Sequence, residues 1–284
     1  MKIKVIVDSG SCLSQQQAQR AGLEFLPLQV MIEDKTYLDG IDLMTESLYD
    51  NLDNGFMPQT SLPPLAMIKD LFDRLEKEQV SDVILITLSS GLSSTNATIQ
   101  AISKEYQIKV HTFDIYSTLA VEQYLALSAI RLVKQGVEID EIMNRLKESM
   151  EHSKGYLMPE NLNHLAKGGR LSSGAAKLAG MLKIVPILEV SKDTQGKVGK
   201  DGEKVRTMTK AIGKVCKSMI QDIKDGEYEV YVLDSRSEKY AQMAEDLFKD
   251  EGIEVHRMSI GAVIASHTGN GAIGIQYIKK VKGH

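Results

Sequence analysis

Two short segments in opposite halves of the chain share one pattern: Lys4–Ser11 reads KVIVDSGS, and Glu229–Ser237 reads EVYVLDSRS. In each, a run of β-branched and apolar residues ends in Asp-Ser and is followed by a helical pattern. Such runs are typical of strands in a mostly buried sheet. The repetition therefore predicts two similar α/β units within one chain.

The sequence around these segments continues the alternation of strand and helix. The predicted strands are Ile3–Val7, Val83–Leu88, Val110–Phe113, Ile184–Val190, Glu229–Leu233, Ile253–His256 and Ile273–Lys280. The predicted amphipathic helices are Leu62–Lys77, Ser117–Gln135, Ile139–Glu151, Glu203–Lys224 and Glu238–Lys249. Strands that alternate with helices of this length indicate an α/β fold with mostly parallel sheets.

Two further features organise the chain. Phe25–Tyr37, with a polar tip at Glu33–Thr36, predicts an inserted hairpin or an edge-strand excursion. The boundary between the two units is expected near Lys154-Gly155. We therefore predict an N-terminal α/β domain over residues 1–154 and a C-terminal α/β domain over residues 155–284.

Composition disfavours several classes of protein. Of the 284 residues, 43% are hydrophobic and 25% are charged, which is enough for a folded core. A formal net charge of -4 disfavours broad non-specific binding of nucleic acid, and a 5% aromatic content without Trp disfavours base stacking. Neither a signal-peptide core nor a window approaching the roughly 18 apolar residues of a membrane span is present. We expect a soluble, cytoplasmic protein.

Cysteine and histidine spacing predicts no metal centre. Cys12 and Cys216 follow no metal-ligand or redox spacing, so reduced thiols are expected, with a single disulfide as the alternative. The six histidines are scattered and form no H-x-x-x-H or Cys/His cluster. We expect neither a metal nor another cofactor.

Three glycines near the C-terminus, Gly269, Gly271 and Gly274, have G-x-G-x-x-G spacing after the apolar run Ile260–Ile264 and His267. A dinucleotide fingerprint needs a helix after the glycines and an acidic residue about 20 residues further on. Here the chain continues into what looks like a last strand. The glycines are therefore expected to make a tight turn between two strands or to allow a close backbone approach.

Hydroxyl side chains gather where the predicted strands end, which is where parallel sheets present their ligand sites. For Asp8, Ser117 and Asp234, capping of the next helix is the favoured interpretation. Residues 89–95, SSGLSST, have five hydroxyls and one glycine, which is more than one cap requires.

Two functions suit these hydroxyls together with one histidine. A serine could act as a nucleophile with His267 as base and Asp8 or Asp114 as the orienting acid, although no G-x-S-x-G turn is present. Alternatively, hydroxyls, turn N–H groups and an imidazolium could together bind a carboxylate. The residues alone leave both interpretations open.

Five segments, taken in order, resemble those of a known family. They are the opening VDSGS, Thr60-Ser61-Leu62-Pro63 (T-S-x-P), Ser89–Thr95 (S-S-x-L-S-G-T), Lys167–Ser172 (K-G-G-R-I-S) and His267–Gly271 (H-x-G-P-G). In this order and spacing, the chain resembles nearly end to end the DegV family, bacterial fatty-acid-binding proteins that serve as acyl carriers for fatty acid kinase.

The resemblance implies two α/β domains with a long-chain fatty acid in an apolar tunnel near their interface. It implies that Thr60, Ser93 and His267 hold the carboxyl group. The neighbouring residues expected at the carboxyl group are Ser61, Ser94, Thr95 and Thr268. A separate kinase subunit would phosphorylate the bound acid to an acyl phosphate for phospholipid synthesis, so this chain would perform no chemistry itself. The expected partners are the fatty acid, that subunit and, transiently, a membrane surface; nucleic acid is not expected.

Basic residues add two expectations. Arg170 follows the predicted helix Glu160–Ala166, where a glycine cap with basic residues at the helix C-terminus is the favoured interpretation, but the resemblance keeps Arg170 as a site residue. Lys204 and Arg206 are proposed to dock the kinase subunit, although a solvated surface is the commoner role. The other basic residues of this face are Lys197, Lys200 and Lys210.

Four positions depart from the family pattern. Ser94 stands where the family usually has glycine, and Asn270 where it usually has proline. Leu62 replaces a commonly polar residue, and Pro64 follows where a hydroxyl is frequent. Ser94 is expected to alter the hydrogen bonds beside the carboxylate, and Asn270, which tolerates positive φ, to alter the last turn.

Two other functions remain as alternatives. The first is a serine-type lipid ester hydrolase that uses Ser93 and His267. The second is a DNA-binding regulator, which the net charge and the lack of a recognisable reading helix disfavour.

Overall fold

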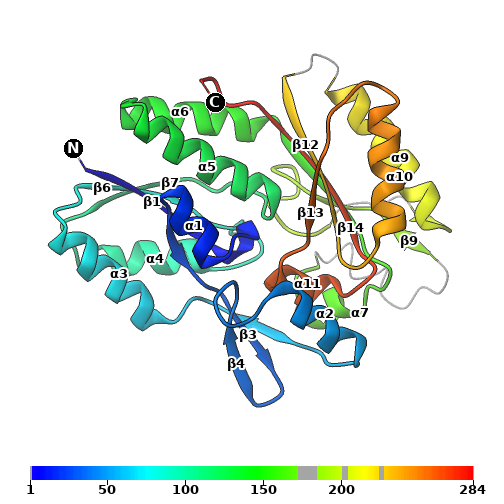
Figure 1. Cartoon of the computed structure of the whole chain (residues 1–284), viewed down its shortest axis with the longest axis horizontal. Coiled ribbons are helices and arrows are strands. Elements are labelled where there is room, and N and C mark those ends of the chain that lie inside the picture. Colours follow the sequence, from blue (N-terminus) through cyan, green and yellow to red (C-terminus); the bar gives the residue numbers. More distant parts are fainter. Residues whose placement is uncertain (1, 172–183, 200–203, 224–226, 284) are drawn as a thin grey trace.

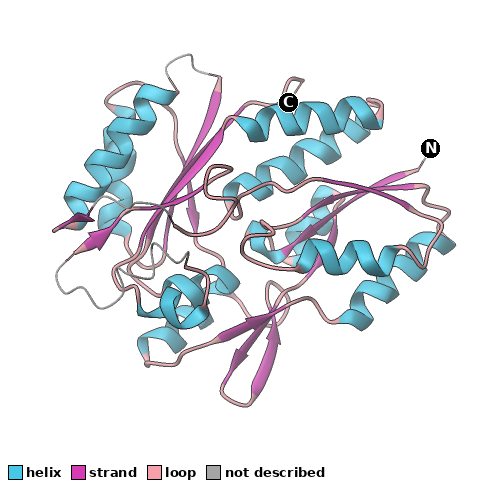
Figure 2. Ribbon diagram, turned by 180° about the vertical axis from the view of Figure 1, so that it is seen from behind, coloured by secondary structure: helices cyan, strands magenta, loops and turns pink. Residues whose placement is uncertain are grey.

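The computed structural model describes residues 2–171, 184–199, 204–223 and 227–283 (Figure 1). In this part of the chain, two main sheets carry helices on their faces, as Figure 2 shows from the opposite side. The α/β class predicted from the sequence is confirmed.

The first sheet has four parallel strands in the order β2-β1-β6-β7. They are β1 (Ile3–Asp8), β2 (Glu24–Leu26), β6 (Asp82–Ile86) and β7 (Lys109–Thr112). The amphipathic helices α3 (Leu65–Lys77) and α4 (Thr95–Ser103) cover one face, and α5 (Ala120–Lys134) covers the other. Because both faces are covered, β6 is buried along its whole length, as its continuous apolar sequence requires.

The second sheet has five strands in the order β10-β8-β14-β12-β13. They are β8 (Ser153–Met158), β10 (Leu188–Val190), β12 (Tyr228–Asp234), β13 (His256–Ser259) and β14 (Ile273–Lys279). Helices α9 (Met208–Asp222) and α10 (Glu238–Lys249) cover its outer face. On the inner side, α5 and α6 (Ile139–Glu151) contact β14, so α5 packs against both sheets.

The prediction of mostly parallel pairing is right for the first sheet and wrong for the second. Only β12 and β13 pair in parallel there, and the other three pairs are antiparallel. Parallel neighbours need a crossover of roughly a dozen residues. Helix α10 supplies one between β12 and β13, whereas β14 returns beside β12 after a short helix. An apolar run does not encode the direction of its strand.

Smaller elements complete the fold. The predicted hairpin is confirmed as β3 (Gln29–Ile32) and β4 (Lys35–Leu38), and β5 (Gln59–Ser61) pairs with β3 on its other side. The remaining strands are β9 (Val185–Pro186) and β11 (Lys204–Val205), which pair with each other. The remaining helices are the short 3-10 helix η1 (Ser9–Ser11), α1 (Gln15–Ala21), α2 (Thr45–Asp53), α7 (Asn163–Gly168) and α11 (Ala262–Thr268).

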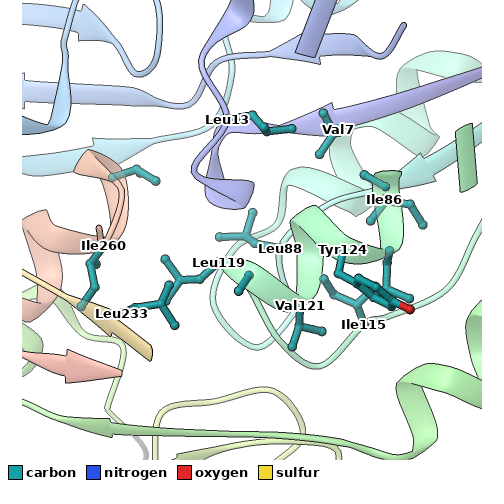
Figure 3. Packing of buried hydrophobic residues seen from close by; sticks show 14 of the residues in the cluster. Val7, Leu13, Ile86, Leu88, Ile115, Leu119, Val121, Tyr124, Leu233 and Ile260 are labelled. Carbon is teal, nitrogen blue, oxygen red and sulfur yellow. The ribbon is translucent and has the colours of Figure 1, made fainter. Parts of the chain in front are cut away.

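The largest apolar core runs continuously from the first sheet to the second half of the chain. Figure 3 shows Val7 and Ile86 on the side of the first sheet, Leu119 between, and Leu233 and Ile260 on the other side. The predicted boundary at residues 154 and 155 falls inside β8. The division into domains 1–154 and 155–284 therefore stays a prediction.

Three predicted elements need correction. The tight turn between two strands, one of the two roles expected for Gly269, Gly271 and Gly274, is wrong, because helix α11 rather than a strand precedes these glycines. The other expected role, a close approach, is confirmed: a Cβ atom would lie 2.8 Å from His164 at Gly269 and 2.0 Å from Glu160 at Gly271. Residues 184–190 split into β9 and β10, which belong to different sheets, and the strand predicted at 253–256 begins only at His256. Both cysteines are free thiols, so the disulfide alternative is wrong.

Candidate ligand-binding site

A largely apolar cavity lies between the two sheets. Its empty volume, part of it open to solvent, is about 790 Å³. The side chains Leu28, Leu88, Leu119, Leu157, Val190 and Val263 form most of its wall. They come from β8 and β10 of the second sheet, from the segments that follow β2 and β6, from the residue before α5, and from α11, so neither half of the chain forms this cavity alone.

Polar groups deep in the cavity already have partners. Gln276 of β14 accepts a hydrogen bond from the Ala120 backbone N–H (3.0 Å) and donates to the Thr118 carbonyl oxygen (3.1 Å). The Thr118 hydroxyl donates to the Gly10 carbonyl oxygen (3.1 Å). Because these groups are satisfied within the protein, this end of the cavity suits an apolar ligand.

One end of the cavity is polar, and two side chains meet there. Thr60 of β5 and His267 of α11 approach to 2.7 Å between Oγ1 and Nε2. β5 is held in place by the register of Thr60 with Val30 of β3. His267 is only 9% exposed, and its Nδ1 atom has no hydrogen-bond partner.

Burial controls the charge of this imidazole. Burial, together with the smaller effects of the positive charge of Arg170 and of nearby His164, lowers the pKa of His267 to about 4. His267 is therefore neutral at pH 7 when no ligand is bound. The imidazolium considered from the sequence is not the resting form, and the guanidinium of Arg170 is the cation at this end of the cavity.

The two glycines that precede Arg170, Gly168 and Gly169, are each required by the local structure. A Cβ atom at Gly168 would lie 2.3 Å from His267 Nδ1, so any side chain would displace the imidazole. The next residue, Gly169, ends α7 with a left-handed φ of 68°, which confirms the predicted glycine cap. The glycine pair therefore has two separate roles, clearance for His267 and termination of α7.

A second, polar cavity lies on the other side of the Thr60–His267 contact. Its wall includes Met57, Pro58, Gln59, His164, Lys167 and Ser266, and it shares Thr60, Arg170 and His267 with the inner cavity. Arg170 donates to the Gly168 carbonyl oxygen (2.5 Å), and no carboxylate pairs with it among the residues that the structure describes. A cation with no counter-ion among the described residues, at the boundary of two cavities, suits an anionic ligand group.

The serine loop reaches the same end of the inner cavity. Leu92 and Ser93 line it, and Ser93 Oγ lies 2.8 Å from Thr95 Oγ1. The loop is supported from the second half of the chain, because a Cβ atom on Gly91 would lie 2.5 Å from the Gln195 carbonyl oxygen. Gly91 therefore permits a close backbone contact that fixes the position of Ser93.

The structure brings together most of the residues singled out from the sequence. Thr60, Ser61, Ser93, His267 and Thr268 line the inner cavity, and so does Arg170. Ser94 and Thr95 are not among its lining residues: Ser94 is exposed, and Thr95 is buried against Ser93. The expected effect of Ser94 on the carboxylate therefore lacks geometric support. The role of each lining residue in ligand binding stays a prediction.

Sequence reasoning missed part of the site. Thr118 lines the inner cavity, and its position after the predicted strand Val110–Phe113 is the signal that could have identified it. His164 and Lys167 line the polar cavity, but no motif distinguishes His164 from any other helical histidine.

The expected docking residues lie away from these cavities. Lys204 is in β11, and Arg206 follows it at the surface. Lys200 lies outside the described residues, as does Ser172 of the Lys167–Ser172 segment. Nothing in the structure tests their contact with a partner.

The triad considered from the sequence, a loop serine with His267 and Asp8 or Asp114, does not form in the part of the chain that the structure describes. His267 Nδ1 faces Gly168 rather than a carboxylate, and its Nε2 meets Thr60 rather than Ser93. Asp8 accepts hydrogen bonds from the backbone of Gly10 and Leu88, which caps η1 as expected. Asp114 accepts hydrogen bonds from the backbone N–H and the hydroxyl of Ser90. The nucleophilic arrangement considered from the sequence is therefore not present.

The described residues contain neither a metal-binding cluster nor a membrane-spanning helix. No cluster of three or more His, Cys, Asp or Glu side chains there has an arrangement that could bind a metal ion. None of the helices in the same residues combines the length and the apolar character that a membrane span requires.

Comparison with known proteins places these features in a family. A family model described as "Uncharacterised protein, DegV family" matches residues 2–280. Protein DegV of Bacillus subtilis is 33% identical over 281 residues, which cover 97% of this chain and 98% of that protein. A DegV domain-containing protein of Streptococcus pyogenes is 33% identical over 277 residues, covering 96% and 97%.

Solved structures agree with the sequence comparison. A fatty acid binding DegV family protein from Streptococcus agalactiae superposes with a TM-score of 0.90 at 31% identity, covering 99% of both chains. DegV from Bacillus subtilis, described as a fatty acid binding protein, superposes with a TM-score of 0.87 at 31% identity, covering 99% and 100%. The fold of this chain is therefore the fold of these proteins.

Proposed function

Because the chain belongs to the DegV family, we propose that it binds a long-chain fatty acid and presents the carboxyl group to a separate kinase subunit. The observation that carries this proposal is the apolar cavity that ends at the Thr60–His267 contact. The acyl chain occupies the inner cavity, and the carboxyl group lies between Thr60, Ser93 and His267. The fatty acid binding of related proteins with solved structures supports the same ligand class here.

The apolar wall supplies the affinity. Burial of a methylene group contributes about 0.8 kcal/mol, so a sixteen-carbon chain gains on the order of 12 kcal/mol before the costs of binding. Leucine and valine side chains from several elements form this wall, and they can shift between rotamers to fit different acyl chains. The polar groups at the deep end are satisfied and do not compete for the ligand.

The carboxyl end of the site requires hydrogen-bond donors. Burial of a neutral polar group without a hydrogen bond costs about 2–7 kcal/mol, and burial of an unpaired carboxylate costs more. In the tautomer with its proton on Nε2, neutral His267 donates to Thr60 Oγ1. The Thr60 hydroxyl proton is then free to donate to the ligand, as is the Ser93 hydroxyl. Arg170 contributes the positive charge, so the site does not depend on a protonated histidine.

The polar cavity supplies access for the phosphoryl donor. It adjoins Thr60 and His267 from the side opposite the acyl chain. In the proposed reaction, a carboxylate oxygen attacks the γ-phosphorus of ATP held by the kinase subunit, and the bond to the ADP oxygen breaks. The products are acyl phosphate and ADP. Lys204 and Arg206 are proposed to contact the kinase subunit, and the domains 1–154 and 155–284 to enclose the lipid.

Extraction of the purified protein with organic solvent, followed by mass spectrometry, tests the proposal. We expect about one equivalent of free fatty acid per chain, and formation of acyl phosphate only when a kinase subunit and ATP are added. Labelling of Ser93 by a serine-directed phosphonate, with no fatty acid extracted, would instead identify a hydrolase and overturn the proposal.

A further inference from the structure

Outside both cavities, a single arginine ties the second sheet to helix α2. Arg236 follows β12 and donates to Asp50 Oδ1 (2.5 Å), to Asp53 and to Glu46 Oε2 (3.4 Å). Its guanidinium also lies over the ring of Tyr49, 5.5 Å from the centroid. All of these partners belong to α2. The backbone of Arg236 has a φ of 53°, a conformation that non-glycine residues adopt only when their surroundings impose it.

Asn270 ties the same helix to the turn that follows His267. Its Nδ2 donates to the Tyr49 carbonyl oxygen (3.0 Å) and to Asp53 Oδ1 (2.6 Å). Its buried Oδ1 has no hydrogen-bond partner among the residues that the structure describes, so the Nδ2 contacts are the polar interactions that hold the side chain in place. The carboxylate of Asp53 receives both Asn270 and Arg236 and joins them into one network.

Helix α2 also contacts the other end of α11. Tyr49 Oη donates to the carbonyl oxygen of Ile260 (2.7 Å), just before α11, and lies 3.2 Å from that of Asp234. The two helices lie side by side below the second sheet (Figure 1). Tyr49 and Asn270 therefore connect α2 to the chain on both sides of the helix that carries His267.

The same helix leads into the strand that carries Thr60. After Asp53, the chain makes one turn and enters β5 at Gln59. The network thus adjoins both partners of the 2.7 Å contact: α2 leads along the chain to Thr60, and Asn270 follows His267 by three residues.

We propose that Asn270 and Arg236, joined through Asp53, are positioning residues that lock α2 onto α11 and so set the geometry of Thr60 and His267. Asn270 supplies a side-chain amide that a proline at this position would lack. The effect on carboxylate binding rests on the proposed function, whereas the effect on the Thr60–His267 contact does not.

Two substitutions of Asn270 test whether this residue positions His267. Asn270→Ala removes the amide, and Asn270→Asp places a carboxylate against Asp53. In ligand-free protein with ¹⁵N-labelled histidine, we expect both variants to shift the His267 ring signals and to raise the pKa of His267 from about 4 toward 6.5, because a looser contact admits water. The signals of His256, which pairs with Glu229 at the edge of the second sheet, should not move.

A rescue makes the assignment specific. Asp53→Asn keeps an oxygen acceptor for Asn270, and Asp50 and Glu46 still pair with Arg236, so this single variant should shift the His267 signals less than Asn270→Ala does. Combined with Asn270→Asp, it restores the amide–carboxylate pair with the roles exchanged but not the donor to the Tyr49 carbonyl oxygen, so the His267 signals should return part of the way toward the wild-type positions.

A stability control completes the experiment. Phe248→Leu loosens the buried core under α10, far from this network, and lowers stability without touching the contact. If Asn270→Ala leaves the His267 signals unchanged, or if Phe248→Leu shifts them equally, the network has no positioning role. With palmitate as the probe, dissociation from Asn270→Ala should be about three- to thirtyfold faster. If the wild type binds no palmitate, the proposed function fails, and the signals of His267 still decide the positioning role.

Discussion

Thr60 Oγ1 and His267 Nε2 lie 2.7 Å apart although 207 residues separate them in the sequence. The contact joins an edge strand of the small sheet to the last helix of the chain. It also forms the boundary between an apolar and a polar cavity. A ligand with an apolar chain and an acidic head would therefore have its chain on the apolar side of this contact and its head at the polar side.

Removal of the Ser93 hydroxyl or of the His267 imidazole should impair presentation of the carboxyl group. We expect Ser93→Ala and His267→Ala to lower acyl phosphate formation with a kinase subunit by about 10- to 100-fold, the loss of one or two hydrogen bonds to a charged group. The fold should remain intact in both variants, as judged by circular dichroism. Ser94→Ala, an exposed neighbour outside the cavity, is the matched control. Wild-type turnover by both test variants would remove these residues from the site.

Stability should depend on pH through His267. A histidine whose folded pKa is lowered to about 4 binds fewer protons in the folded state, so stability is lost as pH falls from 6.5 to about 4. This shift corresponds to roughly 3 kcal/mol at about 1.4 kcal/mol per pH unit. Urea unfolding of wild type and His267→Gln across this range measures the effect.

The comparison with His267→Gln is needed because other groups act in the opposite direction. Burial raises the pKa of Asp8 to about 6 and that of Asp39 to about 7. The contribution of these two groups to the stability of the fold is therefore lost as pH rises. Both remain in the variant and cancel in the difference. A difference in unfolding free energy that stays constant between pH 4 and 6.5 would contradict the buried, neutral imidazole.

Arg170 should influence both the ligand and the imidazole. Arg170→Gln removes the cation next to His267, so we expect the pKa of His267 to rise in ligand-free protein. We also expect slower acyl phosphate formation that depends less on salt, because a charge pair is lost. NMR titration and kinase assays measure the two effects. Lys167→Gln removes a neighbouring charge from the same polar cavity and serves as the comparison.

Gly168 should tolerate no side chain. In Gly168→Ala, the new methyl group would lie 2.3 Å from His267 Nδ1, so the imidazole or α7 must move. We expect a loss of about 1–3 kcal/mol in unfolding free energy and faster release of fatty acid. Gly213→Ala in α9 is the control: its new methyl group meets no atom within 4 Å, so stability should stay constant or rise. Equal behaviour of the two variants would refute the proposed clearance.

If Lys204 and Arg206 dock the kinase subunit, their substitution should change acyl phosphate formation but not the amount of bound fatty acid. Lys204→Glu with Arg206→Glu should slow acyl phosphate formation while the extracted fatty acid stays at the wild-type amount. Lys77→Glu with Lys104→Glu makes the same change in charge on the first half of the chain and should leave turnover unchanged. Unaltered turnover in the first double variant would exclude this surface.

Regular helices with a clear apolar stripe were predictable from sequence. Ile139–Glu151 and Glu238–Lys249 begin and end where their periodicity begins and ends. The hairpin was equally clear, because its polar tip separates two apolar runs. Short elements were missed, among them α1, α2, α4 and β5. A helix of seven to nine residues presents only about two turns, too few for a 3.6-residue period to stand out.

The motifs along the sequence, together with the composition and the periodicity of the long elements, determined the family and the α/β class of this protein. Those properties depend on residues close together in the chain. Tertiary structure alone decided that Thr60 meets His267, that Gly168 gives the imidazole room, and that the imidazole is neutral. It also decided the antiparallel direction of β14 and the place of Asn270 against α2. These properties arise from packing between segments far apart in sequence, where burial and register are set by the whole fold.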